Sequence, residues 1–144
     1  MIVGSGLALN LAQAQQPGIK RTDLQRHDLS VPGREVIQVR VEFAPGASFP
    51  KHSHPGEEIV YVIEGSLEYQ IEDKPPVTLK AGEVLFIPAG TIHAAKNIGS
   101  GNAAELATYI VEKGSRSSCW VSDRRGEVTG GDGINTRGNK RRLS

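Results

Sequence analysis

Three of the four histidines in this chain lie within 42 residues, at His52, His54 and His93. On a β-strand, His52 and His54 leave the same face because they are two residues apart. Glu58 follows four residues later, at the start of a strongly β-prone run. Two imidazoles and a carboxylate on one face, with a third imidazole from another strand, form a ligand set for a divalent transition metal. Each of these side chains alone is typical of a surface, so the prediction rests on the group.

The elements that carry these residues are expected to be short strands. Ile37, Val39, Val41 and Phe43 alternate with polar residues, which is the pattern of a half-buried strand. Gly and Pro residues interrupt the chain every 8 to 12 residues, and no segment has a helical period. The predicted strands cover residues 37–43, 58–64, 67–71, 77–79, 84–87, 92–97 and 105–111. The expected class is therefore all-β, a sandwich or barrel.

Composition limits the classes of function. The 144 residues carry 17 Lys and Arg against 16 Asp and Glu, so the formal net charge is +1. A charge this close to zero argues against a nucleic-acid partner. No apolar run approaches the roughly 20 residues of a membrane-spanning helix, so we expect no membrane span. The single cysteine, Cys119, excludes a disulfide within the chain.

The first 19 residues form the N-terminal part of a predicted three-part layout. They contain no charged side chain. An apolar stretch from Ile2 to Leu11 followed by Ala12-Gln13-Ala14 is typical of a secretory signal peptide, although no basic residue precedes it. We interpret residues 1–19 as a truncated signal peptide, which would place the protein in the periplasm or outside the cell. The alternative is a flexible apolar extension of a cytoplasmic protein.

The other two parts differ in charge. Residues 20–114 carry 10 basic and 13 acidic side chains, and we assign the barrel to them. Residues 115–144 carry seven basic and three acidic side chains and are rich in Gly, Ser and Arg. This composition predicts a basic, disordered tail, or sequence read in a shifted frame beyond the end of the domain. A tail that contacts an acidic partner is the other interpretation.

Two sequence motifs with fixed spacing between their residues resemble those of a known family. The first resembles the first signature motif of the cupin superfamily, with its fixed positions at Gly46, His52, His54, Glu58 and Gly65. The second resembles the second cupin motif, with Gly82, Pro88-Ala89-Gly90, His93 and Asn97. The motifs are 16 residues apart, as in small single-domain bacterial cupins, and the chain also resembles the quercetin-dioxygenase-like members.

The resemblance implies a fold and a metal site. The fold is a double-stranded β-helix barrel of the jelly-roll type, with flexible tails at both ends. The metal ligands are His52, His54, Glu58 and His93, and the ion is Fe, Mn, Ni, Cu or Zn. We interpret Gly46, Gly65, Gly82 and Gly90 as strand-end residues with positive φ. Pro88 fixes the chain before the loop that presents His93, and Asn97 is expected to secure that loop by hydrogen bonds.

The surroundings of the metal are expected to be apolar. The predicted pocket residues are Phe43, Phe49, Val60, Phe86 and Tyr109. Their inward or outward direction depends on strand register, because a slip of one residue reverses the face. Tyr61, Tyr69 and Tyr109 are candidates to offer a hydroxyl group to a ligand, and a place on the rim is the alternative for each.

The resulting prediction of function is broad. A divalent ion held by three neutral imidazoles and one carboxylate keeps a charge of about +1 and open positions, which favours a small anionic or oxygen-donor ligand. The chemistry is then dioxygenase-like or that of a non-redox isomerase or lyase, with Glu58 also a candidate base. The alternative is a non-enzymatic module that binds or senses a small ligand. A structural subunit of a larger assembly is the third class.

The resemblance also implies a homodimer. Small cupins often exchange or add an N-terminal strand, and the candidate here is the segment Lys20–Ser30, because exposed sheet edges need cover.

Overall fold

The computed structural model describes residues 16–115 and 120–121, and these form ten strands and no helix. Residues 1–15 of the predicted signal peptide lie outside the described residues, and so does most of the predicted tail. The strands are β1 (Ile19–Asp28), β2 (Arg34–Phe43), β3 (Ser48–Ser53), β4 (Glu57–Glu64), β5 (Ser66–Ile71), β6 (Val77–Lys80), β7 (Val84–Ile87), β8 (His93–Asn97), β9 (Ala103–Glu112) and β10 (Trp120–Val121).

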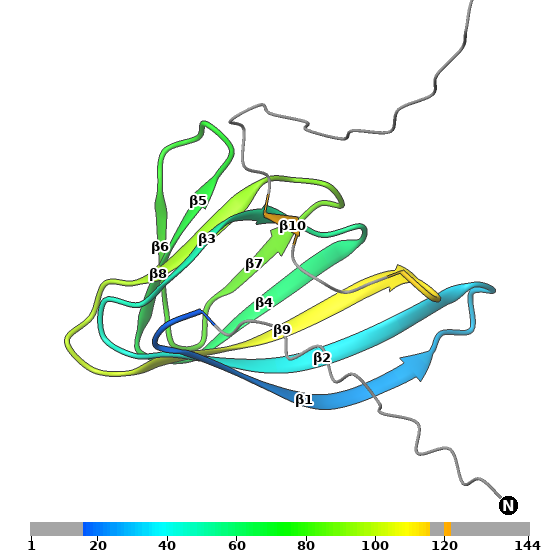
Figure 1. Cartoon of the computed structure of the whole chain (residues 1–144), viewed down its shortest axis with the longest axis horizontal. Helices are drawn as coiled ribbons and strands as arrows, with labels where there is room; N and C mark the ends of the chain where they lie inside the picture. Colours follow the sequence, from blue (N-terminus) through cyan, green and yellow to red (C-terminus); the bar gives the residue numbers. More distant parts are fainter. Residues whose placement is uncertain (1–15, 116–119, 122–144) are drawn as a thin grey trace, which may run out of the picture.

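The strands build two five-stranded antiparallel sheets that face each other (Figure 1). One sheet has the order β1-β2-β9-β4-β7 and the other has the order β10-β3-β8-β5-β6. Consecutive strands alternate between the sheets over much of the chain, which is the jelly-roll arrangement that the sequence predicts. Among the described residues, no helix is long and apolar enough to cross a membrane.

The core lies between the sheets and follows the predicted alternation. Ile37, Val39, Val41 and Phe43 all point inward from β2, and each is at most 7% exposed. Opposite them, β5 contributes the buried side chains of Leu67 and Tyr69. The inner faces are therefore largely apolar, so the polar groups buried there stand out.

The segment predicted to exchange between subunits pairs within its own chain. β1 runs antiparallel to β2 from Ile19 opposite Phe43 to Asp28 opposite Glu35. Arg26 of β1 fixes this pairing with two hydrogen bonds, of 2.7 and 2.5 Å, to the buried carboxylate of Glu35. β1 thus covers the edge of β2, and the homodimer stays a prediction.

The four motif glycines have the predicted positive φ angles, between 73° and 91°. At Gly65 a second constraint applies, because a Cβ atom there would lie 2.6 Å from the carbonyl oxygen of Asn102 and 2.9 Å from Cα of Ala103. At Gly46 the space around such a Cβ is open. Gly65 is therefore required by the close approach of two backbone segments as well as by its own conformation.

Asn97 joins the ends of three segments in the interior. Its Nδ2 donates to the carbonyl oxygens of Phe43, Ala44 and Gly101 at 2.8–3.2 Å, and its Oδ1 accepts from the Gly99 amide at 2.9 Å. The prediction that it secures the loop before His93 is wrong, because its side chain ties the β8–β9 loop to the end of β2. The physical reason is that His93 begins β8 and Asn97 ends it, so Asn97 lies at the end of the strand away from that loop.

The interior also contains a hydrogen-bonded pair of polar side chains that the strand pattern does not predict. Tyr69 of β5 donates its phenolic hydrogen to Oε2 of Glu105 in β9, across the two sheets. Burial, and then the nearby charge of Glu58, raise the pKa of Glu105 to about 8, although the hydrogen bond from Tyr69 works against this. Glu105 therefore holds a proton between about pH 4.5 and 8, where an exposed carboxyl group is ionised.

We expect Gly65→Ala to lower the free energy of unfolding by roughly 3 kcal/mol, because it combines a positive φ with a backbone clash. Gly46→Ala is the matched control, since it has the same φ and no clash, and should lose only about 1 kcal/mol. Chemical denaturation of both variants measures the difference. Equal losses would contradict the close approach at Gly65.

Glu105 should make stability fall as pH rises. Its pKa in the folded state lies above its value in the unfolded chain, so the folded state binds the extra proton between about pH 4.5 and 8. Across that window the metal-free protein should lose on the order of 1 kcal/mol per pH unit relative to Glu105→Gln, which cannot titrate. Urea unfolding at pH 5, 6.5 and 8 in the presence of a chelator measures both slopes. The exposed Glu64→Gln should keep the wild-type slope, and an identical slope in Glu105→Gln would refute the assignment.

Candidate metal centre

The three motif histidines converge between the sheets. His52 of β3 and His93 of β8 stand directly opposite each other in the strand pairing, and His54 follows β3 immediately. The ligand atoms of the three imidazoles all lie within 4.8 Å of one another, and all three side chains are buried. This spacing is within reach of a single ion with bonds of about 2.1 Å.

Glu58 completes the group from the other sheet. In β4 it lies opposite Tyr109 of β9 and Ile87 of β7. Its Oε2 atom lies 3.0 Å from Nε2 of His93 and 3.3 Å from Nε2 of His54. The structure thus brings together the four residues that the sequence singles out.

Backbone carbonyl groups orient two of the rings. Nδ1 of His52 donates to the Pro50 carbonyl oxygen at 2.7 Å, and Nδ1 of His93 donates to that of Thr91 at 2.9 Å. Because a carbonyl oxygen only accepts, Nδ1 must carry the hydrogen in both rings, and Nε2 then offers its lone pair to the centre of the group. This is the tautomer that a metal ligand needs.

The side chains are also short of hydrogen-bond partners. Oε2 of Glu58 and both ring nitrogens of His54 are buried and make no hydrogen bond to the described residues. Buried polar atoms without partners are costly, and lone pairs that face one another at 3.0–3.3 Å require a proton or a cation between them. The donor set therefore fits a divalent cation.

Burial and neighbouring charges also shift the pKa values of these side chains. Burial, and then repulsion from His93, lower the pKa of His52 to about 4, so its ring is neutral at neutral pH. Burial raises the pKa of Glu58, but the His54 and His93 imidazoles outweigh this and lower it to about 2. Burial lowers the pKa of His93, but Glu58 outweighs it and raises the pKa. An ionised carboxylate thus faces imidazoles whose lone pairs are available once a cation displaces the proton.

Two backbone features hold the four residues in register. The Gly90 amide donates to the His54 carbonyl oxygen at 2.8 Å, which joins the second motif to the first. Gly56 lets β4 approach β9, because a Cβ atom at this position would lie 2.0 Å from the Ile110 carbonyl oxygen. Gly56 is missing from the sequence prediction, and the Pro55-Gly56 pair between His54 and Glu58 was the available signal.

A cavity of about 20 Å³ adjoins the histidines. The residues that line it are Arg21, Val41, Phe43, Phe49, His52, Glu58, Tyr69, His93, Ala95, Glu105 and Tyr109. The volume corresponds to about one or two water molecules. Phe43, Phe49 and Tyr109 are therefore placed as the sequence predicts.

Two of the predicted pocket residues lie elsewhere. The prediction for Phe86 is wrong, because it pairs with Ile59 on the outer face of the sheet and is 59% exposed. Its strand β7 is apolar on both faces, so the sequence could not fix the inward phase. Val60 is fully buried but belongs to the core rather than to the cavity wall. Tyr61 is exposed on the outer face as well.

Arg21 and Glu105 are cavity residues that the sequence prediction missed. Arg21 lies in a stretch that is polar at nearly every position, so no alternation marks its inward side. Glu105 lies in a strand whose two faces are both largely apolar, where a carboxylate is expected to face water.

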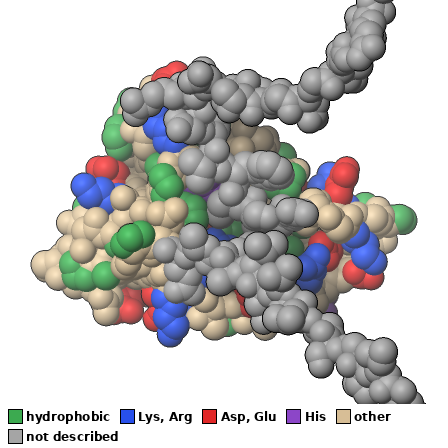
Figure 2. Space-filling view, in the orientation of Figure 1, with side chains coloured by type: hydrophobic (Ala, Val, Ile, Leu, Met, Phe, Trp, Pro, Cys, Tyr) green, Lys and Arg blue, Asp and Glu red, His purple; other side chains and the backbone are tan. Residues whose placement is uncertain are grey.

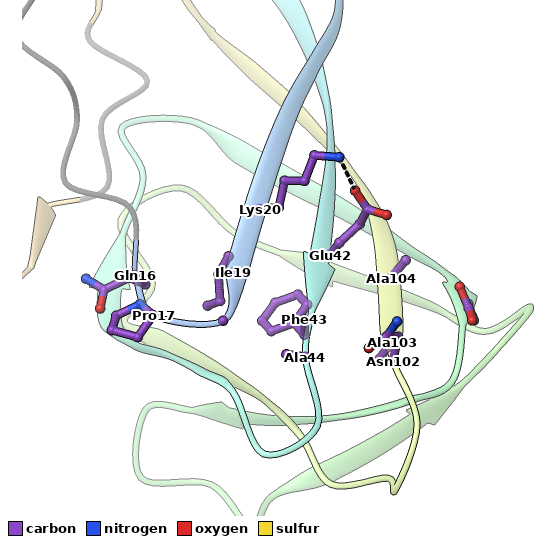
Figure 3. A pocket seen from close by; sticks show the side chains of 12 residues that line it. Gln16, Pro17, Ile19, Lys20, Glu42, Phe43, Ala44, Asn102, Ala103 and Ala104 are labelled. Atoms are coloured by element: carbon purple, nitrogen blue, oxygen red, sulfur yellow. Dashed lines mark ion pairs between the residues drawn. The ribbon is translucent and has the colours of Figure 1, made fainter.

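A larger cavity, of about 520 Å³, lies at the start of β1 and contains no histidine (Figure 3). It is bordered by the ion pair between Lys20 and Glu42, whose Nζ and Oε2 atoms are 3.5 Å apart. Phe43 lines both cavities and therefore separates this one from the histidines. The proposed metal ligands His52, Glu58 and His93 thus line the smaller cavity and not the larger one.

Comparison with known proteins agrees with the fold. Residues 39–111, half of the chain, match the cupin domain family Cupin_2. The chain is 37% identical to germin-like protein subfamily 2 member 2 of Arabidopsis thaliana over 87 residues, which cover 55% of this chain and 40% of that protein. It is 36% identical to subfamily 1 member 5 of the same plant over 117 residues, covering 72% of this chain and 50% of the relative. The chain thus spans about half the length of these relatives, or less.

Solved structures agree with the fold. A cupin superfamily protein from Desulfitobacterium hafniense superposes with a TM-score of 0.56 at 22% identity, over 69% of this chain and 84% of that one. Oxalate oxidase superposes with a TM-score of 0.55 at 28% identity, over 69% of this chain and 57% of that one. The matched family covers both histidine motifs, and the chain therefore belongs to the cupin family.

Proposed function

We propose that this cupin is a metal-dependent enzyme that acts on a small carboxylate. A divalent transition metal ion is held by His52, His54, Glu58 and His93. The observation that carries the proposal is the convergence of three imidazoles on a buried carboxylate oxygen that makes no hydrogen bond. The residues come from both sheets, so the folded barrel presents the ligands already arranged.

The donor set indicates which ligands the site would take. Three neutral imidazoles and one carboxylate would leave a divalent ion with a net charge of about +1 and with open positions, which favours an anionic oxygen donor. Such an ion supplies Lewis-acid chemistry and, if it is redox-active, electron transfer between substrate and dioxygen. In this proposal Glu58 is a ligand, and Phe43 and Phe49 keep water away from the ion.

The size of the cavity favours a small substrate. A space of about 20 Å³ is far smaller than a flavonol or a catechol ring, and among organic substrates a two- or three-carbon acid would need the least widening of it. The structural similarity to oxalate oxidase supports this class, since that enzyme has also been solved with the substrate analogue glycolate. We therefore propose a small carboxylic acid in place of the aromatic substrates of quercetin-dioxygenase-like cupins.

Removing one imidazole should abolish metal binding. We expect His52→Ala and His54→Ala to weaken the affinity for Mn²⁺ or Co²⁺ by 100-fold or more, measured by calorimetry, and to empty the site in elemental analysis of purified protein. His27→Ala is the matched control, because His27 is exposed on β1 and lies outside both motifs. Full metal occupancy in His52→Ala would refute the assigned site.

Turnover should be confined to small acids. Oxygen consumption and product formation are measured for the metal-loaded protein with oxalate, glycolate and other two- and three-carbon acids, and with flavonols and catechols. We expect turnover in the first group and none in the second. Turnover of flavonols would refute the size argument, and binding of the acids without turnover would indicate a binding module instead of an enzyme.

A further inference from the structure

Arg21 reaches the cavity of the candidate metal centre because of the register of three strands. Arg21 of β1 lies opposite Val41 of β2, and Val41 lies opposite Glu105 of β9. Residues directly opposite one another point to the same face of a sheet, and Val41 and Glu105 are buried inside. Arg21 therefore points inward, and among the described residues that line this cavity it is the only Lys or Arg.

The contacts of Arg21 link it to the proposed ligands. Its guanidinium carbon lies 6.0 Å from the centre of the Tyr109 ring. That ring in turn lies 4.7 Å from the ring of His54, and Tyr109 stands opposite Glu58 in the strand pairing. Tyr109 is only 3% exposed, whereas Arg21 is partly exposed. The guanidinium thus lies over a ring that contacts the histidine cluster, between the interior and the solvent.

The charges around Arg21 leave room for an anion. Glu58 and Glu105 are the carboxyl groups that line this cavity, and His52 and His93 are its imidazoles. In the proposed function Glu58 binds the ion, and even with Glu105 ionised the negative charges of the two carboxylates are outweighed by those of a divalent ion and Arg21. With a divalent ion bound, the cavity carries an excess of positive charge. A planar guanidinium matches a carboxylate better than any other side chain does.

We propose that Arg21 determines the specificity of the site by binding the carboxylate of a two- or three-carbon acid whose other oxygen donor reaches the metal. This inference rests on the proposed function, because it assumes an ion at His52, His54, Glu58 and His93. It adds that Arg21 selects ligands that carry a negative charge. Arg21 lies in β1, which is outside both histidine motifs. The competing interpretation is that Arg21 only supplies a counter-charge to Glu105.

Ligand binding to the Co²⁺-loaded protein tests the proposal. Glycolate and its neutral isostere glycolamide are titrated while the visible absorption of Co²⁺ is recorded. Arg21→Gln should weaken glycolate binding by about 10-fold or more, leave glycolamide binding unchanged and leave Co²⁺ affinity within about 3-fold. Arg21→Lys should recover part of the glycolate affinity. Lys20→Gln is the matched control, since it removes one positive charge from the opposite face of the same strand, and it should behave as wild type.

Several results would overturn the assignment of Arg21. An unchanged glycolate affinity in Arg21→Gln would do so, and so would equal losses for glycolate and glycolamide, which indicate a structural role. If Arg21→Gln does not fold, Arg21→Lys still decides, because a counter-charge to Glu105 predicts no change in the preference for glycolate over glycolamide. A wild-type protein that binds Co²⁺ but not glycolate would also refute the role of Arg21. A wild-type protein that binds no Co²⁺ would instead refute the proposed function.

Discussion

Three imidazoles and the carboxyl groups of Glu58 and Glu105 are buried together between two apolar sheets, and the need to compensate them is the constraint on which the rest of this structure depends. A buried ionisable group is tolerated only when a proton, a hydrogen bond or an opposite charge offsets its desolvation. Glu105 retains a proton and accepts a hydrogen bond from Tyr69. His52 and His93 donate to backbone carbonyl groups. Of the atoms left without a hydrogen bond, Oε2 of Glu58 and Nε2 of His54 lie 3.3 Å apart, where the proposed metal would sit.

The backbone meets this constraint through strand pairing. His52 and His93 face each other because β3 and β8 pair, and an irregularity between Phe49 and His52 sets their register. Glu58 arrives from the other sheet, where Gly56 allows β4 to lie close to β9. Small displacements in either sheet would separate the ligands, so the glycines and the Asn97 hydrogen bonds at the strand ends serve the site as well as the fold.

The outer surface contributes little to this arrangement. Figure 2 shows acidic and basic side chains interspersed around the described part of the face in view, so no patch of a single sign dominates it. The outer side of β4 and β7 carries exposed apolar residues, including Tyr61 and Phe86. In the proposed function, selectivity for a small ligand would arise inside the barrel, from β1 and β9 as well as from the two motifs. In the proposed function the motif residues of the cupin fold would hold the ion, and these neighbouring strands would supply the charges around it.

The fold class and the four proposed ligands could be predicted from the linear sequence. Alternation in β2 and regularly spaced Gly and Pro residues predict strands, because side chains on a strand repeat every two residues. The spacing of the four proposed ligands can be recognised in the sequence, because His52, His54 and Glu58 lie within seven residues of one another. The strand pairing, in contrast, was needed to show that Arg21 and Glu105 face the cavity and that Phe86 does not. Their strands are polar or apolar on both faces, and their direction follows from pairing with β2 and β4, which no single strand encodes.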